Sequence, residues 1–158
     1  MKKYVFFVVL AVIIVCIASS TSYEQQTIVP ELETVLENKP FEDQLSKLHL
    51  TYWGRPISVE TRGYFYFVEF LIRKSTHFVG FGIIGVLFFL LYRKLGWRFS
   101  ALFGIGSIFL LASLDEFRQT FTDGRTGMFG DVLIDTAGAI FFITITTSFL
   151  AIKKRVFS

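Results

Sequence analysis

The stretch LDEFRQTFTDGRTGMFGDVLID, residues 114–135, separates two strongly apolar runs of the chain. It contains five of the thirteen carboxylates of the protein, which are Asp115, Glu116, Asp123, Asp131 and Asp135. Ionisable groups beside membrane-like sequence are costly unless they pair, remain hydrated or serve a function. The stretch therefore predicts a polar site at the face of a membrane.

The composition of the chain indicates a membrane protein. Of its 158 residues, 53% are hydrophobic, and Phe alone occurs 20 times. A soluble domain of this size is too small to hide so much apolar surface from water. The single cysteine, Cys16, lies inside the first apolar run. An intrachain disulfide and a cluster of metal-bound thiolates are therefore excluded.

Four apolar segments predict an all-α membrane protein, a small bundle of four transmembrane helices. Residues 1–20 are expected to form the first helix and to remain in the membrane, with a cleaved signal peptide as the alternative. Residues 21–63 are predicted to be an extracytoplasmic segment between the first and second helices. Residues 64–158 are expected to form the membrane domain, with its helices near 74–92, 99–114 and 132–152.

Shorter patterns predict local structure before the second membrane helix. A short helix is expected over residues 31–39, and YWGRP at 52–56 predicts a turn. Ser58 or Thr61 is expected to cap a following helix. Residues 64–72 are too few to cross a membrane, so they are expected to lie in the interface or to lead into the second membrane helix.

The distribution of charge predicts which side of the membrane each segment faces. The N-terminus, the turn at 93–98 and the tail at 153–155 contain eight Lys and Arg residues and no carboxylate. Because cytoplasmic loops are enriched in Lys and Arg, both termini are expected in the cytoplasm. The 21–73 and 115–131 segments are then outside. The predicted localisation is the cell membrane, with a chain that crosses it several times.

Three of the predicted helices carry polar residues at the ends that are expected to face the outside of the membrane. Lys74 and His77 are three residues apart, and Asp131 and Asp135 are four apart, so each pair shares a helix face. Asp135 is expected one turn below the surface and directed into the bundle. The candidate catalytic residues are His77, Asp115, Glu116 and Asp131. The candidate ligand-binding residues are Lys74, Gln119, Arg125 and Asp135.

The sequence leaves three interpretations of this cluster open: a charge-balanced network that holds the helix ends together, a binding or catalytic site, and a metal site. The spacing matches no zinc or calcium motif, so no metal ligand and no cofactor is assigned. The glycines at 124, 127 and 130 do not form a nucleotide-binding pattern. No nucleic-acid partner is predicted.

Three motifs resemble the VanZ-like family of small bacterial membrane proteins. They are, in order, IRKSTHF (72–78), SLDEFRQTFTDGRTG (113–127) and GDVLIDTAGA (130–139), and the resemblance covers roughly residues 65–150. It implies a protein that acts at the outer cell envelope. It also implies a link to resistance to teicoplanin, a lipid-tailed glycopeptide antibiotic.

Two functional hypotheses follow. In the first, an outward-facing polar pocket binds a lipid-linked or cell-wall component, and Arg125 and Lys74 take its anionic group. In the second, the protein is an intramembrane hydrolase or transferase acting on a lipid-linked phosphate. His77 would then be the general acid or base, oriented by Asp115 or Glu116. The expected partners are the lipid bilayer and this envelope ligand. The sequence leaves open the oligomeric state and whether the protein is an enzyme.

Overall fold

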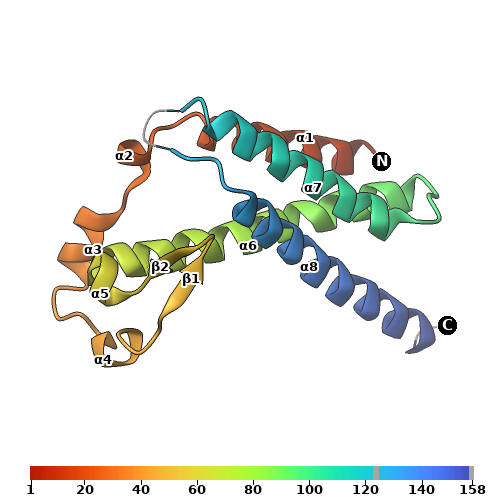
Figure 1. The fold of residues 1–158 in the computed structure, drawn as a ribbon. Coiled ribbons are helices and arrows are strands. Elements are labelled where there is room, and N and C mark those ends of the chain that lie inside the picture. The colour runs from red at the N-terminus through yellow and green to blue at the C-terminus, as the bar shows by residue number, and fades with distance from the viewer. Residues whose placement is uncertain (123–124, 157–158) are drawn as a thin grey trace.

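Three long helices form the main body of the protein in the computed structural model, which describes residues 1–122 and 125–156. Asp123 and Gly124 of the polar stretch thus lie outside the described residues. Each long helix is apolar and long enough to cross a membrane. Figure 1 shows α6 running through the middle of the molecule, and α7 and α8 pack against it and against each other. The three helices are α6 (Tyr64–Lys94), α7 (Ser100–Gln119) and α8 (Phe129–Val156).

A fourth apolar helix, α1 (Lys2–Ala18), packs against α6. At about 1.5 Å per residue it is about 25 Å long, slightly shorter than a hydrocarbon core of about 30 Å. After a short break the chain continues into residues 23–35 at an angle of 120°. The described residues thus contain three candidate spans, or four when this bent pair is counted as one. The structure confirms a mostly helical fold with three to four candidate spans.

The helix α6 is longer than the sequence predicted. It begins at Tyr64, so residues 64–72 form the first turns of the same helix that carries His77. Its 31 residues span about 46 Å at 1.5 Å per residue, which exceeds the thickness of a hydrocarbon core. The first turns of α6 therefore extend beyond one end of the bundle (Figure 1).

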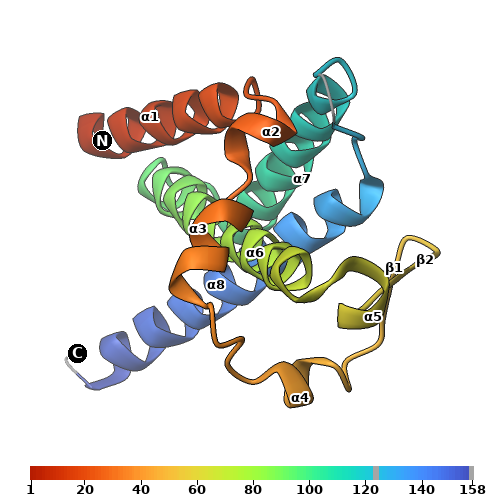
Figure 2. The ribbon, with the colours of Figure 1, turned by 90° about the vertical axis from the view of Figure 1, so that its left-hand side faces the viewer.

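Small elements from the segment 21–63 surround these first turns of α6, as Figure 2 shows. Ser58 caps one of them, α5, through a reciprocal capping box with Thr61. Gly63 then ends α5 with a φ of 80°, and α6 starts at the next residue. The small elements are α2 (Tyr23–Gln26), α3 (Val29–Val35), α4 (Glu42–Leu45), β1 (Leu50–Tyr52), β2 (Arg55–Ile57) and α5 (Val59–Arg62).

The turn expected at 52–56 is the centre of a β-hairpin, whose strands the sequence analysis did not predict. β1 and β2 pair antiparallel, with Tyr52 opposite Arg55. Trp53 and Gly54 connect them with φ values of 51° and 75°, the conformation that two-residue hairpin turns require. Residues directly opposite in a hairpin point to the same side. The side chains of Tyr52 and Arg55 therefore lie next to each other on the same face of the hairpin.

Close packing fixes α6 against α8 in the apolar part of the bundle. A Cβ added at Gly138 would clash with the carbonyl oxygen of Phe78, and one added at Gly85 would lie 2.9 Å from the Cβ of Ala139. Small residues let two helices approach closely inside a membrane, where the hydrophobic effect does not drive their association. These contacts fix how α6 and α8 cross, at a point below the polar end of the bundle.

Candidate functional site

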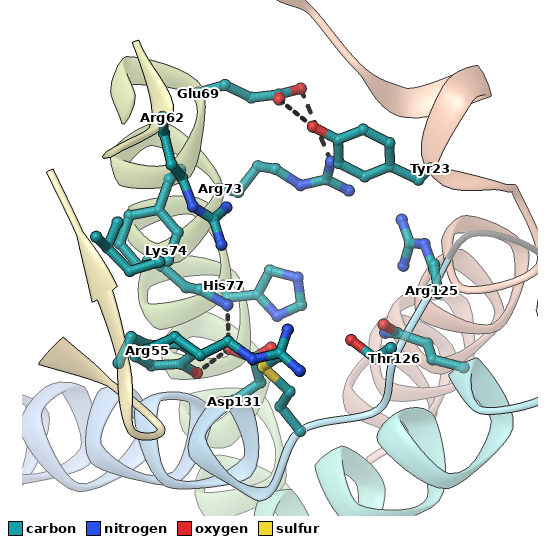
Figure 3. Close-up of a pocket in the computed structure, with 15 residues that line it drawn as sticks. Tyr23, Arg55, Arg62, Glu69, Arg73, Lys74, His77, Arg125, Thr126 and Asp131 are labelled. Atoms are coloured by element: carbon teal, nitrogen blue, oxygen red, sulfur yellow. Dashed lines mark hydrogen bonds and ion pairs between the residues drawn. The ribbon is translucent and has the colours of Figure 1, made fainter. Parts of the chain in front are cut away.

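A cavity of about 250 Å³ lies where the first turns of α6 meet the hairpin, α2 and the connection between α7 and α8 (Figure 3). We call it the cationic cavity, because its lining contains five Lys and Arg side chains and only two carboxylates. The excess of positive charge favours an anionic ligand. Its charged lining residues are Arg55, Arg62, Arg73, Lys74, Arg125, Glu69 and Asp131.

Glu69 attaches the segment 21–63 to α6. Its side chain is only 2% exposed. Its Oε2 accepts a hydrogen bond from the hydroxyl of Tyr23 (2.8 Å), and its Oε1 accepts one from the backbone N–H of Ile28 (3.0 Å). Arg73 lies one helical turn further on, with Nη1 3.8 Å from Oε1. Burial and the hydrogen bond to Glu69 raise the pKa of Tyr23, so its phenol remains a donor.

Asp131, in the first turn of α8, joins three elements at one carboxylate. Lys74 of α6 forms an ion pair with it, and Tyr52 of the hairpin donates a hydrogen bond to it. The ammonium of Lys74 also lies over the ring of Tyr52, 4.5 Å from its centroid. Burial, with the hydrogen bond to Asp131, raises the pKa of Tyr52. The cluster thus holds hairpin, α6 and α8 together at the wall of the cavity.

His77 lies beside Asp135, with its Nδ1 3.3 Å from Oδ1 of that carboxylate. Asp135 is fully buried in α8, whereas His77 lines the cationic cavity. From the sequence, Asp115 or Glu116 was the expected partner of His77. The helix registers explain the difference, because Asp131 and Asp135 share a face of α8 that meets the face of α6 carrying Lys74 and His77.

Asp115 and Glu116 make contacts within α7 and with the connection that follows it. Asp115 accepts a hydrogen bond from Nε2 of Gln119 (2.8 Å), one turn further along. Glu116 accepts one at Oε2 from the backbone N–H of Met128 (2.7 Å). Gly127 permits this approach, since a Cβ there would clash with the carbonyl oxygen of Glu116. Gln119 lines the cationic cavity, whereas neither acid belongs to its described lining.

Arg125 reaches the cavity from the connection between α7 and α8. It donates a hydrogen bond to Oε1 of Gln26, and its Nε is buried without a hydrogen-bond partner among the described residues. Burial lowers the pKa of Arg125, and the positive charge of Arg73 lowers it further. Figure 3 shows Arg125 extending toward Arg73. An anion between these two guanidinium groups would offset their repulsion and supply the missing acceptor.

Several residues of the cationic cavity were not predicted from the sequence. Glu69 and Arg73 precede the predicted His77 at intervals of four, so all three lie along one face of α6. This periodicity would have identified Glu69 and Arg73 had the helix been extended back to Tyr64. The hairpin residues, Tyr52 and Arg55, carried no comparable signal, because strand pairing brings them together. In the described ranges, no group of three or more His, Cys, Asp or Glu side chains is arranged to hold a metal ion.

Together the fold and the cavity define an α-helical membrane protein with a cation-rich polar site at one end of its bundle. The chain belongs to the VanZ/LLP1 family, whose model matches residues 4–151. This match confirms the resemblance and extends it over α1 and the segment 21–63. Comparison with curated proteins finds no significant match, and neither does comparison with solved structures.

Proposed function

We propose that the cationic cavity faces the outside of the cell membrane and binds an anionic, phosphate-type group of a cell-envelope component. The observation that carries this proposal is the unmatched positive charge of the cavity. Both of its carboxylates are already engaged, Glu69 by Arg73 and Asp131 by Lys74. Arg55, Arg62 and Arg125 take part in no ion pair with any described residue.

Guanidinium groups suit such a ligand. Each presents several N–H donors in a planar fork, which matches the oxygens of a phosphate group. Arg55, Arg62 and Arg125 come from the hairpin, α5 and the α7–α8 connection, so they approach the cavity from different directions. A tetrahedral phosphate can use donors from several directions at once. Lys74 would add charge at the wall while remaining paired with Asp131.

The outward orientation is supported by where the basic ends of the chain lie. Figure 1 shows the N-terminus, the turn between α6 and α7 and the C-terminal end of α8 at the end of the bundle away from the small elements. These three regions carry basic residues and no acidic ones. By the enrichment of Lys and Arg in cytoplasmic loops, the turn between α6 and α7 and the C-terminus are cytoplasmic, and the cavity is extracytoplasmic. With α1 retained in the membrane, as we also propose, the N-terminus is cytoplasmic as well.

Labelling of intact cells tests this topology. In a Cys16→Ser background, a cysteine introduced by Thr122→Cys should react with a membrane-impermeant maleimide. A cysteine introduced by Leu95→Cys, in the turn at the opposite end, should react only after the membrane is permeabilised. The reverse pattern would overturn the orientation.

Binding of glycerol 3-phosphate tests the ligand class. The full chain, held in maltoside detergent micelles that contain no phosphate, should bind this soluble phosphate saturably. Arg125→Gln should weaken binding about tenfold or more, because a hydrogen bond to a charged group contributes about 1.5–3 kcal/mol. Arg98→Gln removes the same charge at the opposite end and should leave binding unchanged. Absence of saturable binding, or equal binding by both variants, would contradict the proposal.

We also propose that this binding alters susceptibility to teicoplanin, as the family resemblance implies. Cells that express the wild type should show reduced teicoplanin susceptibility, and cells that express Arg125→Gln at equal level should not. Arg98→Gln should behave as the wild type. Equal susceptibility of all strains, including one without the protein, would remove the link to this antibiotic.

A second candidate function is hydrolysis of a phosphate ester in the same cavity, supported by the pairing of His77 with the buried Asp135. This pairing holds Nδ1 and leaves Nε2 for the cavity, as in sites that use histidine as a general base. Nε2 would take a proton from water as the water oxygen bonds to phosphorus, and would return a proton to the departing ester oxygen. If this holds, lysophosphatidic acid releases inorganic phosphate with the wild type but not with His77→Gln, which still binds it. No release by the wild type would exclude this function for that substrate.

A further inference from the structure

A second cavity, of about 340 Å³, lies between α1, α6 and α7. We call it the apolar groove, because most of its lining is hydrocarbon from α1 and α6. Ile14 and Ala18 contribute from α1, and Gly80 and Ile83 contribute from α6. Nothing lies within 4 Å of the position that a Cβ on Gly80 would occupy, so this glycine borders open space.

The apolar groove and the cationic cavity are continuous. His77, Gln119 and Arg125 line both of them. From His77 the groove follows α6 to Ile84, a distance of about 10 Å at 1.5 Å per residue, in the direction of the apolar middle of the bundle. A ligand that fills both spaces would have its charged part among the arginines and its apolar part at the depth of lipid chains.

We propose that the ligand is a membrane lipid with a phosphate-type headgroup, and that it enters sideways from the bilayer with a hydrocarbon chain in the apolar groove. Binding of the headgroup rests on the proposed function of the cationic cavity. The site for the hydrocarbon chain and the lateral route from the bilayer go beyond that function. Charge complementarity selects the headgroup, and the continuity of the two spaces places the chain beside α1.

This arrangement gives α1 a specific role. Ile14, Val15 and Ala18 form the wall of the groove that faces α6, so removal of α1 would open the groove to the bilayer along its length. The polar rim formed by His77, Gln119 and Arg125 lies where the headgroup and the first carbons of the chain would join. Side chains that bind an ester oxygen there would distinguish a lipid phosphate from a free hydrocarbon chain.

The test compares two phosphates that differ in their hydrocarbon chain. Glycerol 3-phosphate is the headgroup alone, and lysophosphatidic acid adds one long acyl chain. Both are measured with the full chain in maltoside detergent micelles, which contain no phosphate. Gly80→Phe fills the groove, and Ala18→Phe fills it from the opposite wall. Gly106→Phe is the matched control, because Gly106 of α7 is exposed, borders open space and lines neither cavity.

Both groove-filling variants should weaken lysophosphatidic acid binding at least about tenfold and leave glycerol 3-phosphate binding unchanged. Gly106→Phe should change neither. Retained glycerol 3-phosphate binding shows that the variants are folded. If both groove-filling variants bind lysophosphatidic acid as the wild type does, the chain does not lie in the groove and the inference is wrong. If the wild type binds neither phosphate, the proposed function of the cationic cavity fails instead.

Discussion

The first turns of α6 and the remainder of the same helix are held in place in different ways. Between Tyr64 and His77, polar and cation–π contacts attach α6 to the hairpin, to α2 and to α8. From Phe78 onward, small residues and apolar side chains pack α6 tightly against α8 and α7. The apolar part therefore sets the positions of the helices, and these positions bring the charged side chains of the polar part together. Substitutions in the apolar part should therefore affect the stability of the whole fold, and substitutions in the polar part should have more local effects.

The largest expected effect comes from Gly138→Leu in the packed part. The new side chain would clash with the backbone of Phe78, which cannot move without displacing α6. We expect a loss of more than about 3 kcal/mol in the free energy of unfolding, or no folded protein. Thermal unfolding in detergent measures this. Gly106→Leu serves as the control, and a Gly138→Leu variant as stable as that control would contradict the packing account.

A smaller loss is expected from Asp135→Leu at the boundary between the two parts. It removes the buried partner of His77 and leaves the imidazole without a carboxylate. Loss of a hydrogen bond to a charged group costs about 1.5–3 kcal/mol. Asp135→Asn should cost less, because its amide oxygen can still accept a hydrogen bond from the imidazole. Equal stabilities of Asp135→Leu and the exposed-site control Asp43→Leu would show that the pair adds nothing to the fold.

Glu69→Gln should have a local effect in the polar part. The amide weakens acceptance from Tyr23 and from the backbone of Ile28, at a cost of about 1–2 kcal/mol. We expect faster cleavage of the segment 21–63 by protease, with the thermal stability of the long helices nearly unchanged. Glu60→Gln, at an exposed position of α5, is the control. Cleavage at the wild-type rate would mean that Glu69 does not attach this segment.

The smallest effect concerns the pH dependence of Tyr52. Burial raises its pKa above the ordinary value of 10.0, so the folded state binds the phenolic proton more tightly than the unfolded state. The associated stability is fully present below about pH 10 and is lost as the pH rises toward the higher pKa of the folded state. In an ultraviolet titration, the wild type should show one more phenol than Tyr52→Phe, ionising above pH 10. Ionisation of that phenol below pH 10 would contradict the assignment.

The sequence predicted which residues share a helix face, but it did not predict how the helices are rotated against one another. Periodicity identified the faces that carry Lys74 with His77 and Asp131 with Asp135, because it describes one helix at a time. It could not give the rotation of α8 against α6, which decides that His77 meets Asp135 rather than Asp115 or Glu116. That rotation depends on the packing of Gly85 and Gly138.

The outer wall of the cavity was harder to predict for a related reason. Tyr23 and Glu69 are 46 residues apart, and Tyr52 and Asp131 are 79 apart. Contacts over such separations follow from the whole fold and leave no periodic pattern in either segment. Arg55 in particular reaches the cavity only because the hairpin turn at Trp53 and Gly54 pairs it with Tyr52.

Phosphorus NMR of glycerol 3-phosphate tests most directly whether Arg55, Arg62 and Arg125, which form no ion pair with any described residue, bind a phosphate group. A variant with Arg55, Arg62 and Arg125 all changed to Gln should lose saturable binding. A variant with Arg93, Lys94 and Arg98 all changed to Gln has the same net charge and should bind as the wild type. If the two variants bind alike, the phosphate does not bind in the cavity and the account is wrong.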